Sequence, residues 1–373
     1  MGDLRADGFS SSAKPGSAAG ENLHGGGWPS DVPSQQGTVA ASVESSVAAE
    51  PSCLICNDSV RPRYGLPGLS RRFSLETVAT VSWCDVCDVG FLFPRPSPEA
   101  NALLYDEYFD RKNRGAALSV RPHPTLLNRL RVHLAYRLDW GSGSQIDLIR
   151  KHVSQGEVDM CEIGCGTGDM LSAFARAGFR TVGVEPTASA IRQAREKDLE
   201  VLAGSAEELP AALPRAAFDI VLLTQVLEHC HDPIRAIRGA LSLLRPRGVL
   251  AVDVPNCGSF QFRDRGMDWF HADPGRHVNY FTPGALQALM GRVGAEVLDR
   301  YYYQYLDHFL EERIEVERVG WERTQRGEGS SEPSGSPPVS RLRLLGTLAR
   351  TCFLPHDQKY GLVGVIARRV GTV

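Results

Sequence analysis

The chain has 373 residues, of which 42% are hydrophobic and 23% charged, a balance typical of a folded globular protein rather than a disordered one. Its 41 basic and 44 acidic side chains nearly cancel, which argues against nonspecific nucleic-acid binding as its main work. No apolar run approaches the roughly 18–20 residues of a membrane span. The first residues lack a secretory signal, so we expect a cytoplasmic protein.

The first half of the chain divides into three segments by composition. Residues 1–50 are dominated by Gly, Ser and Ala, and we predict a disordered tail because few large apolar groups offset the entropy of ordering. Residues 51–98 favour β-strands over helices and contain four cysteines. Residues 99–155 place leucines at roughly helical spacing, which predicts a helical connector.

The four cysteines form two C-x-x-C pairs, Cys53/Cys56 and Cys84/Cys87. Each pair places two thiolates on one tight turn, and two such turns complete a tetrahedral site. We therefore predict a structural zinc ribbon over 51–98. A thioredoxin-like redox pair is the alternative, but it expects a βαβ setting that this segment lacks.

From residue 156 onward, apolar strands alternate with amphipathic helices. Residues 158–163, 180–184, 218–223 and 249–254 have the composition of strands covered on both faces. Repeated βα units predict a doubly wound parallel sheet with a ligand crevice at the carboxyl ends of its strands. We assign 156–304 to this core.

The end of the chain is expected to complete the sheet. Residues 295–301 and 361–368 resemble strands and could form an antiparallel hairpin. The hairpin would then carry an insert at 305–358, with a flexible linker at 326–338, before the final strand and C-terminus at 359–373.

A glycine-rich loop follows the first strand of the core and opens a helix. It reads Glu162-Ile163-Gly164-Cys165-Gly166-Thr167-Gly168. Glycines permit a tight turn and the close approach of a ligand to the main chain. A dinucleotide fingerprint would need glycine at 169, where the chain has Asp169. A pyrophosphate would also be repelled by Glu162 and Asp169.

An acidic residue, Glu185, stands at the end of the next strand, 21 residues after Gly164. A carboxylate in this place accepts hydrogen bonds from ribose hydroxyls. The loop and Glu185 together indicate a nucleoside ligand with cationic rather than phosphate groups. S-adenosylmethionine, with its ammonium and sulfonium groups, fits.

These motifs, with GSAEELP (204–210), FDIVLLTQVLEHCHDP (218–233) and LLRPRGVLAVDVPN (243–256), resemble the class I S-adenosylmethionine-dependent methyltransferases. The resemblance implies a Rossmann-like seven-stranded α/β sheet. It implies cofactor binding by Glu162, Gly164, Gly166 and Gly168, by Glu185 at the ribose, by Ser205 and Ala206 at the adenine, and by Thr224 and Gln225 at the methionine end. With the ribbon, the chain looks like a bacterial subgroup of sugar and natural-product methyltransferases.

Methyl transfer is an in-line displacement that often requires a base. His229 follows the strand 218–223, and His277 lies with Tyr280 in a loop after 249–254. These three residues are the catalytic candidates, and a structural role is the alternative for each of them. We expect a small-molecule or carbohydrate-linked acceptor and no nucleic-acid partner. An RNA methyltransferase and a non-catalytic cofactor-binding scaffold are the alternatives.

Overall fold

The computed structural model describes residues 52–66, 69, 78–97, 126–139, 141, 144–154, 156–310 and 341–370. The predicted tail 1–50 and the linker 326–338 lie outside the described residues, as does 99–125 of the predicted connector. All of the described residues belong to one unit, Ala40–Val373.

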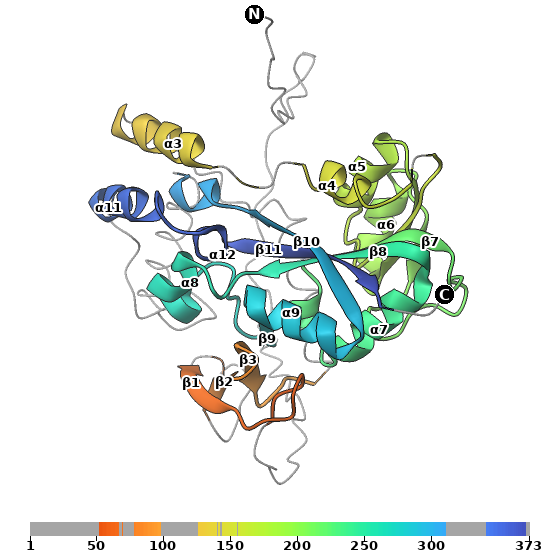
Figure 1. Cartoon of the computed structure of the whole chain (residues 1–373), viewed down its shortest axis with the longest axis horizontal. Helices are drawn as coiled ribbons and strands as arrows, with labels where there is room; N and C mark the ends of the chain where they lie inside the picture. Colours follow the sequence, from red (N-terminus) through yellow and green to blue (C-terminus); the bar gives the residue numbers. More distant parts are fainter. Residues whose placement is uncertain are drawn as a thin grey trace, which may run out of the picture. The chain divides into compact units, whose positions relative to one another are not determined.

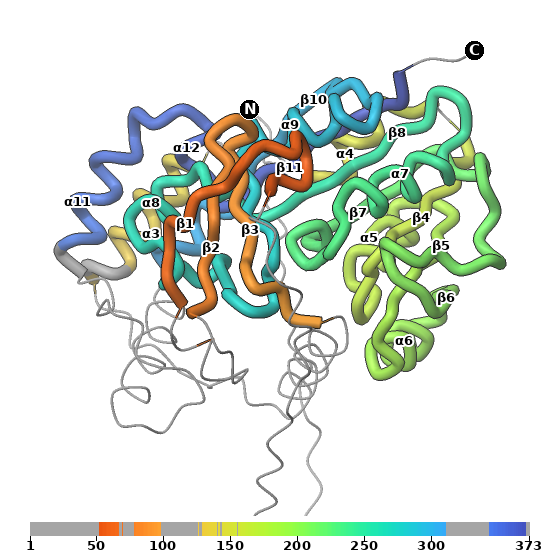
Figure 2. Tube along the Cα trace, turned by 90° about the horizontal axis from the view of Figure 1, so that it is seen from below, coloured from red at the N-terminus to blue at the C-terminus, as the bar shows by residue number. Residues whose placement is uncertain are grey.

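The larger sheet has seven strands in the order β10-β11-β8-β7-β4-β5-β6. Figure 1 labels β10, β11, β8 and β7, and Figure 2 also labels β4, β5 and β6. Neighbours from β6 to β8 are parallel, whereas β11 is antiparallel to both β8 and β10. This confirms the predicted Rossmann-like sheet and its closing antiparallel hairpin. The strands are β4 (Asp159–Ile163), β5 (Arg180–Glu185), β6 (Val201–Ala203), β7 (Phe218–Thr224), β8 (Leu244–Pro255), β10 (Ala295–Tyr303) and β11 (Leu362–Arg369).

Two of the helices between the strands begin at a short polar side chain that caps them. The Asp232 carboxylate accepts from Arg235 N at 2.8 Å, and a proline at the next position starts α7. Thr282 Oγ1 likewise accepts from Ala285 N at 3.1 Å at the start of α9. Four helices of eight or more residues lie between β4 and β10 in the chain: α5 (Asp169–Arg176), α6 (Ala188–Arg195), α7 (Pro233–Leu243) and α9 (Pro283–Arg292).

Further helices lie before the sheet and between its strands. They are α3 (Leu126–Leu138), α4 (Gln145–Arg150), α8 (Phe260–Arg265), α11 (Arg341–Thr351) and α12 (His356–Lys359), with the 3-10 turns η1 (Leu227–His229), η2 (Gly266–Asp268) and η3 (Leu306–Phe309). Across the described residues, no helix combines the length and apolar character that crossing a bilayer requires.

A second, four-stranded antiparallel sheet has the order β1-β2-β3-β9 (Figure 2). Its strands are β1 (Arg61–Leu66), β2 (Ala79–Cys84), β3 (Val89–Phe93) and β9 (Asn279–Tyr280). Gly90 pairs with Tyr280 and Phe91 with Asn279. The cysteine-containing segment therefore shares a sheet with the loop that carries the candidate catalytic residues, which the sequence did not reveal.

Candidate active site and metal centre

The glycine loop turns sharply between β4 and α5. Gly164, Gly166 and Gly168 have φ values of 75°, 52° and 77°, in the left-handed region that favours glycine. A Cβ on Gly164 would lie 2.5 Å from Val226 Cγ2, whereas a Cβ on Gly166 would meet no atom within 4 Å. Gly164 therefore permits packing against the segment after β7, and Gly166 leaves the main chain open to a ligand.

The structure brings Glu185 onto this loop. Its two carboxylate oxygens accept from Gly166 N and Thr187 N, each at 2.9 Å. The side chain is buried at the carboxyl end of β5. The two motifs predicted to act together are thus joined by a direct hydrogen bond.

Glu162, at the base of the loop, is only 2% exposed, and its Oε2 has no hydrogen-bond partner. Burial raises the pKa of Glu162 well above 4.5, with a further contribution from the nearby Asp253 carboxylate. A buried carboxylate oxygen without a donor is costly. It can be satisfied by a cationic or N–H group of a ligand.

A polar network centred on Asp253 was missed at the sequence level. The Asp253 carboxylate accepts from Gln225 Nε2 at 2.9 Å and Gln145 Nε2 at 2.8 Å. It also accepts from the hydroxyls of Tyr303 at 2.7 Å and Tyr301 at 3.2 Å. The available signal was a single acidic residue within the apolar run 249–254.

The remaining predicted cofactor residues occupy the edges of the same region. Gln225 holds a left-handed backbone with φ of 56°, and the neighbouring Thr224 has a buried Oγ1 without a hydrogen-bond partner. Ser205 Oγ accepts from Glu208 N at 3.0 Å, so its side chain closes a local turn. Ala206 is buried.

The candidate catalytic histidines meet beside η1. The rings of His229 and His277 lie 4.6 Å apart between centroids at 71°. Burial lowers the pKa of His229 to about 3 and lowers that of His277 well below 6.5, so both imidazoles are neutral near pH 7. Glu228, which sequence reasoning did not single out, joins them with both carboxylate oxygens buried and unpartnered.

Tyr280 lies beneath this group rather than at a surface. It is 1% exposed, and its hydroxyl donates to His277 O at 3.1 Å. The adjacent Asn279 Nδ2 donates to Leu227 O at 2.8 Å and Cys230 O at 2.7 Å. Tyr280 and Asn279 thus hold the histidine segment against η1.

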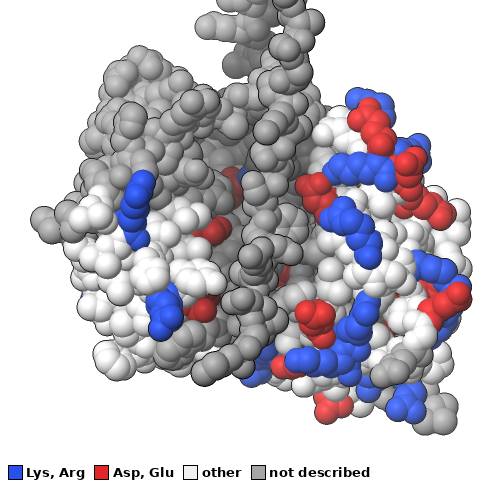
Figure 3. Space-filling model, turned by 90° about the horizontal axis from the view of Figure 1, so that it is seen from above, with Lys and Arg blue, Asp and Glu red and all other residues white. Residues whose placement is uncertain are grey.

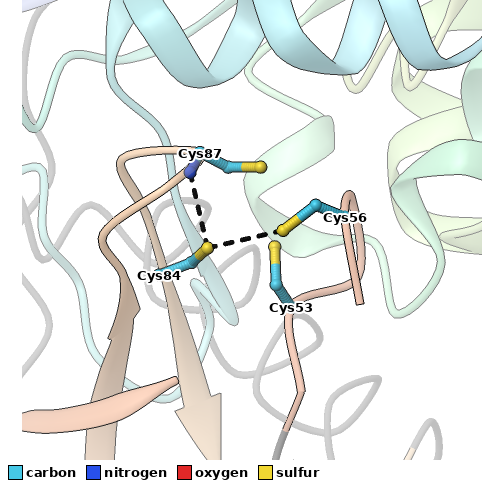
Figure 4. A group of neighbouring side chains, drawn as sticks. All are labelled: Cys53, Cys56, Cys84 and Cys87. Atoms are coloured by element: carbon cyan, nitrogen blue, oxygen red, sulfur yellow. Dashed lines mark hydrogen bonds between the residues drawn. The ribbon is translucent and has the colours of Figure 1, made fainter. Parts of the chain in front are cut away.

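The four predicted zinc ligands converge (Figure 4). Their sulfur atoms all lie within 4.8 Å of one another, and Cys56 Sγ is 3.7 Å from Cys84 Sγ. Backbone amides of Ile55 and Cys87 donate to Cys53 Sγ and Cys84 Sγ, each at 3.4 Å. The sequence-predicted group is therefore assembled in space.

Comparison with known proteins shows the family of the core. A family model described as a methyltransferase domain matches residues 109–300, just over half of the chain. The chain belongs to this methyltransferase-domain family. The prediction of a class I S-adenosylmethionine-dependent methyltransferase domain is therefore confirmed.

Individual relatives are similar over the core. A "probable S-adenosylmethionine-dependent methyltransferase" of Mycolicibacterium smegmatis is 34% identical over 38% of this chain and 53% of its own. A ubiquinone biosynthesis O-methyltransferase of Azorhizobium caulinodans is 32% identical over 36% of this chain and 58% of its own. The chain thus spans about half the length of these curated relatives. A solved methyltransferase of Archaeoglobus fulgidus has 17% identity and a TM-score of 0.43, over 71% of this chain and 100% of that one.

Proposed function

We propose that the protein transfers a methyl group from S-adenosylmethionine to a small-molecule or carbohydrate-linked acceptor, on oxygen or carbon. The observation that carries this proposal is the unpartnered, buried Glu162 carboxylate oxygen beside a glycine loop that is bonded to Glu185. An ammonium group is the ligand chemistry that such an oxygen favours.

Each part of the cofactor is assigned to residues at or after the end of one strand. Glu185 accepts from the ribose hydroxyls, Gly166 presents open main chain, and Glu162 compensates cationic charge. Ser205 and Ala206 flank the adenine. Thr224, whose hydroxyl has no partner, and Gln225 lie at the methionine end.

On the acceptor side, His229 and His277 assist the removal of a proton while the acceptor attacks the sulfonium methyl in line. The neutral imidazoles are in the proton-accepting form. Tyr280, whose hydroxyl is taken by a backbone carbonyl, acts by holding His277 in place.

A sugar-linked acceptor is favoured by the combination of a four-cysteine ribbon with this core, as in the subgroup that the sequence resembles. A phenolic hydroxyl is the second class, because relatives named ubiquinone biosynthesis O-methyltransferase match the core. Nucleic acid is not the expected partner: basic and acidic side chains are interspersed on the described part of the face in Figure 3.

The cysteine group fits a structural zinc ion. A tetrahedral ion with bonds of about 2.3 Å sets its sulfur ligands roughly 3.8 Å apart, close to the 3.7 Å between Cys56 and Cys84. Burial raises the pKa of Cys53 to about 11, so a cation is needed to favour its thiolate.

The experiment is a turnover assay with methyl-labelled S-adenosylmethionine and a panel of nucleotide sugars, glycosides, catechols and RNA. We expect label in a sugar or phenol and none in RNA. Transfer to RNA would contradict the proposed acceptor class. Cofactor binding without transfer to any member of an expanded small-molecule panel would favour the scaffold.

A further inference from the structure

A second cluster of metal-ligating side chains lies where η1 meets the segment before β9. Glu228, His229 and His277 each offer one ligand atom, and these atoms lie within 4.8 Å of one another. Among the described residues, this cluster and the four cysteines are the two groups of this kind. The ribbon does not contribute to it.

The carboxylate in the cluster is buried and accepts no hydrogen bond. Glu228 is 1% exposed, and neither of its oxygens has a hydrogen-bond partner. Leaving a buried carboxylate unpaired costs free energy unless a proton or a cation satisfies it. One ring nitrogen of each histidine lies within 4.8 Å of a carboxylate oxygen of Glu228, so a cation bound among the three would neutralise the carboxylate.

The His229 ring is oriented as a metal ligand requires. Its Nδ1 lies 3.0 Å from the carbonyl oxygen of Arg276. A carbonyl only accepts, so Nδ1 carries the proton and Nε2 holds the lone pair. A histidine that binds metal typically donates its other N–H to a carbonyl or carboxylate.

The backbone fixes the two halves of the cluster to each other. Val278 N donates to Glu228 O at 2.8 Å, so the residue after His277 is bonded to the residue that bears the carboxylate. The nearby Arg276 guanidinium forms an ion pair with Asp273. That pairing weakens its repulsion of a bound cation.

We propose that Glu228, His229 and His277 bind one divalent transition-metal ion at the carboxyl end of β7. Two imidazoles and one carboxylate suit zinc, iron(II), cobalt or nickel, and three protein ligands leave coordination positions open. The proposal that this cluster binds a metal ion does not depend on the proposed methyl transfer. The catalytic use of the ion rests on the proposed function and changes the part that the histidines play in it: as ligands they take up no proton, and the cation instead lowers the pKa of an acceptor hydroxyl, whose proton passes to water.

The test uses the full-length protein with its ribbon already loaded with zinc. Cobalt(II) is added, unbound metal is removed, and both metals are counted by mass spectrometry. We expect a second metal equivalent in the wild type, with an absorption spectrum that lacks thiolate-to-cobalt charge transfer. Calorimetric titration with zinc should show the same additional site.

Glu228→Gln and His277→Gln should each retain the ribbon metal and bind the second equivalent at least tenfold more weakly. His308→Gln and Glu196→Gln are the matched controls and should bind as the wild type does. Thermal unfolding verifies that each variant is folded, and if Glu228→Gln fails to fold then His277→Gln decides.

One metal equivalent in the wild type, or unchanged affinity in the folded variants, would overturn the proposed site. S-adenosylmethionine binding is measured on the same preparations. Cofactor binding without a second metal refutes this inference alone, whereas a second metal without cofactor binding refutes the proposed function alone.

Discussion

Three buried carboxylates near the carboxyl ends of parallel strands, Glu162 on β4, Glu185 on β5 and Asp253 on β8, have different hydrogen-bond environments. Glu185 accepts two backbone amides, Asp253 accepts four side-chain donors, and Glu162 has one oxygen without a partner. Glu185 and Asp253, whose oxygens accept hydrogen bonds, hold the loop and the network in place, whereas Glu162 is proposed to face the cationic part of the cofactor. The residues therefore differ in what their substitution should change.

Glu185→Gln should weaken S-adenosylmethionine binding without unfolding the protein. The amide keeps the volume but removes the charge that strengthens hydrogen bonds to the ribose, a loss of about 1.5–3 kcal/mol, or roughly ten- to hundredfold in affinity. Isothermal titration calorimetry measures it, with the exposed Glu196→Gln as control. Unchanged affinity would show that the ribose lies elsewhere.

Glu162→Gln should alter the pH dependence of stability. Because the folded-state pKa of Glu162 is raised well above 4.5, the folded chain retains a proton that the unfolded chain releases. The stability from this group is present below about pH 4.5 and is lost as the pH rises toward the folded-state pKa, by at most about 1.4 kcal/mol per pH unit.

Urea unfolding of the protein without cofactor, at several pH values from about 5 to 8, tests this expectation. Glu162→Gln should become progressively more stable relative to wild type as the pH rises. The Glu196→Gln control should show a constant difference. A constant difference for Glu162→Gln as well would mean that Glu162 ionises normally in the fold.

The predictable part of the site is local in sequence. The glycine spacing and the strand-end position of Glu185 follow from two successive βα units, so the pattern alone indicated them. The burial of Glu228 without a hydrogen-bond donor depends on elements far apart in the chain. The same is true of the four donors around Asp253. Tyr303, for example, reaches Asp253 across 50 positions, and no local pattern encodes that contact.

At the scale of elements, the cysteine-containing segment is joined to the core by β3–β9 pairing, by apolar packing and by hydrogen bonds, of which Arg95 supplies two. Arg95 donates to the carbonyl of His231 at 2.8 Å and to Asn279 Oδ1 at 2.6 Å. Burial lowers the pKa of Arg95 to about 10. Because Asn279 belongs to β9, Arg95 links β3 with the segment that carries His277.

Arg95→Ala should destabilise the protein by about 2–4 kcal/mol, because buried acceptors lose a charged donor. Chemical denaturation measures the loss. The exposed Arg61→Ala on β1 is the control and should change stability by no more than about 0.5 kcal/mol. An equally small effect for Arg95→Ala would mean that β3–β9 pairing and apolar packing hold this segment without Arg95.

Cys84→Ser should remove one zinc equivalent and lower the melting temperature, since a structural metal contributes its binding free energy to folding. Metal content by mass spectrometry and thermal unfolding are measured together. Cys352→Ser, outside the cysteine group, should keep both values. Full zinc content in Cys84→Ser would contradict the four-cysteine site.

The ribbon illustrates which elements the sequence could predict. Its C-x-x-C turns carry their own signal, and the structure gathers all four sulfur atoms. Its fourth strand, Asn279–Tyr280, is only two residues long and comes from nearly 190 positions later. Strand pairing over such a separation leaves no trace in local composition.

At the scale of the whole molecule, the sheet was the most predictable feature. Its parallel strands are nearly continuous apolar runs because helices cover both faces, and the order of βα units then limits the topology to few choices. The acceptor itself depends on pocket shape, which composition does not encode.

The central claim is that the bend after β4 holds a nucleoside sulfonium. Isothermal titration calorimetry of the full-length protein with S-adenosylmethionine, S-adenosylhomocysteine and NADH tests it most directly. We predict one site per chain for each of the first two ligands and no heat with NADH. Saturable binding of NADH together with no response to either sulfur compound would contradict the account.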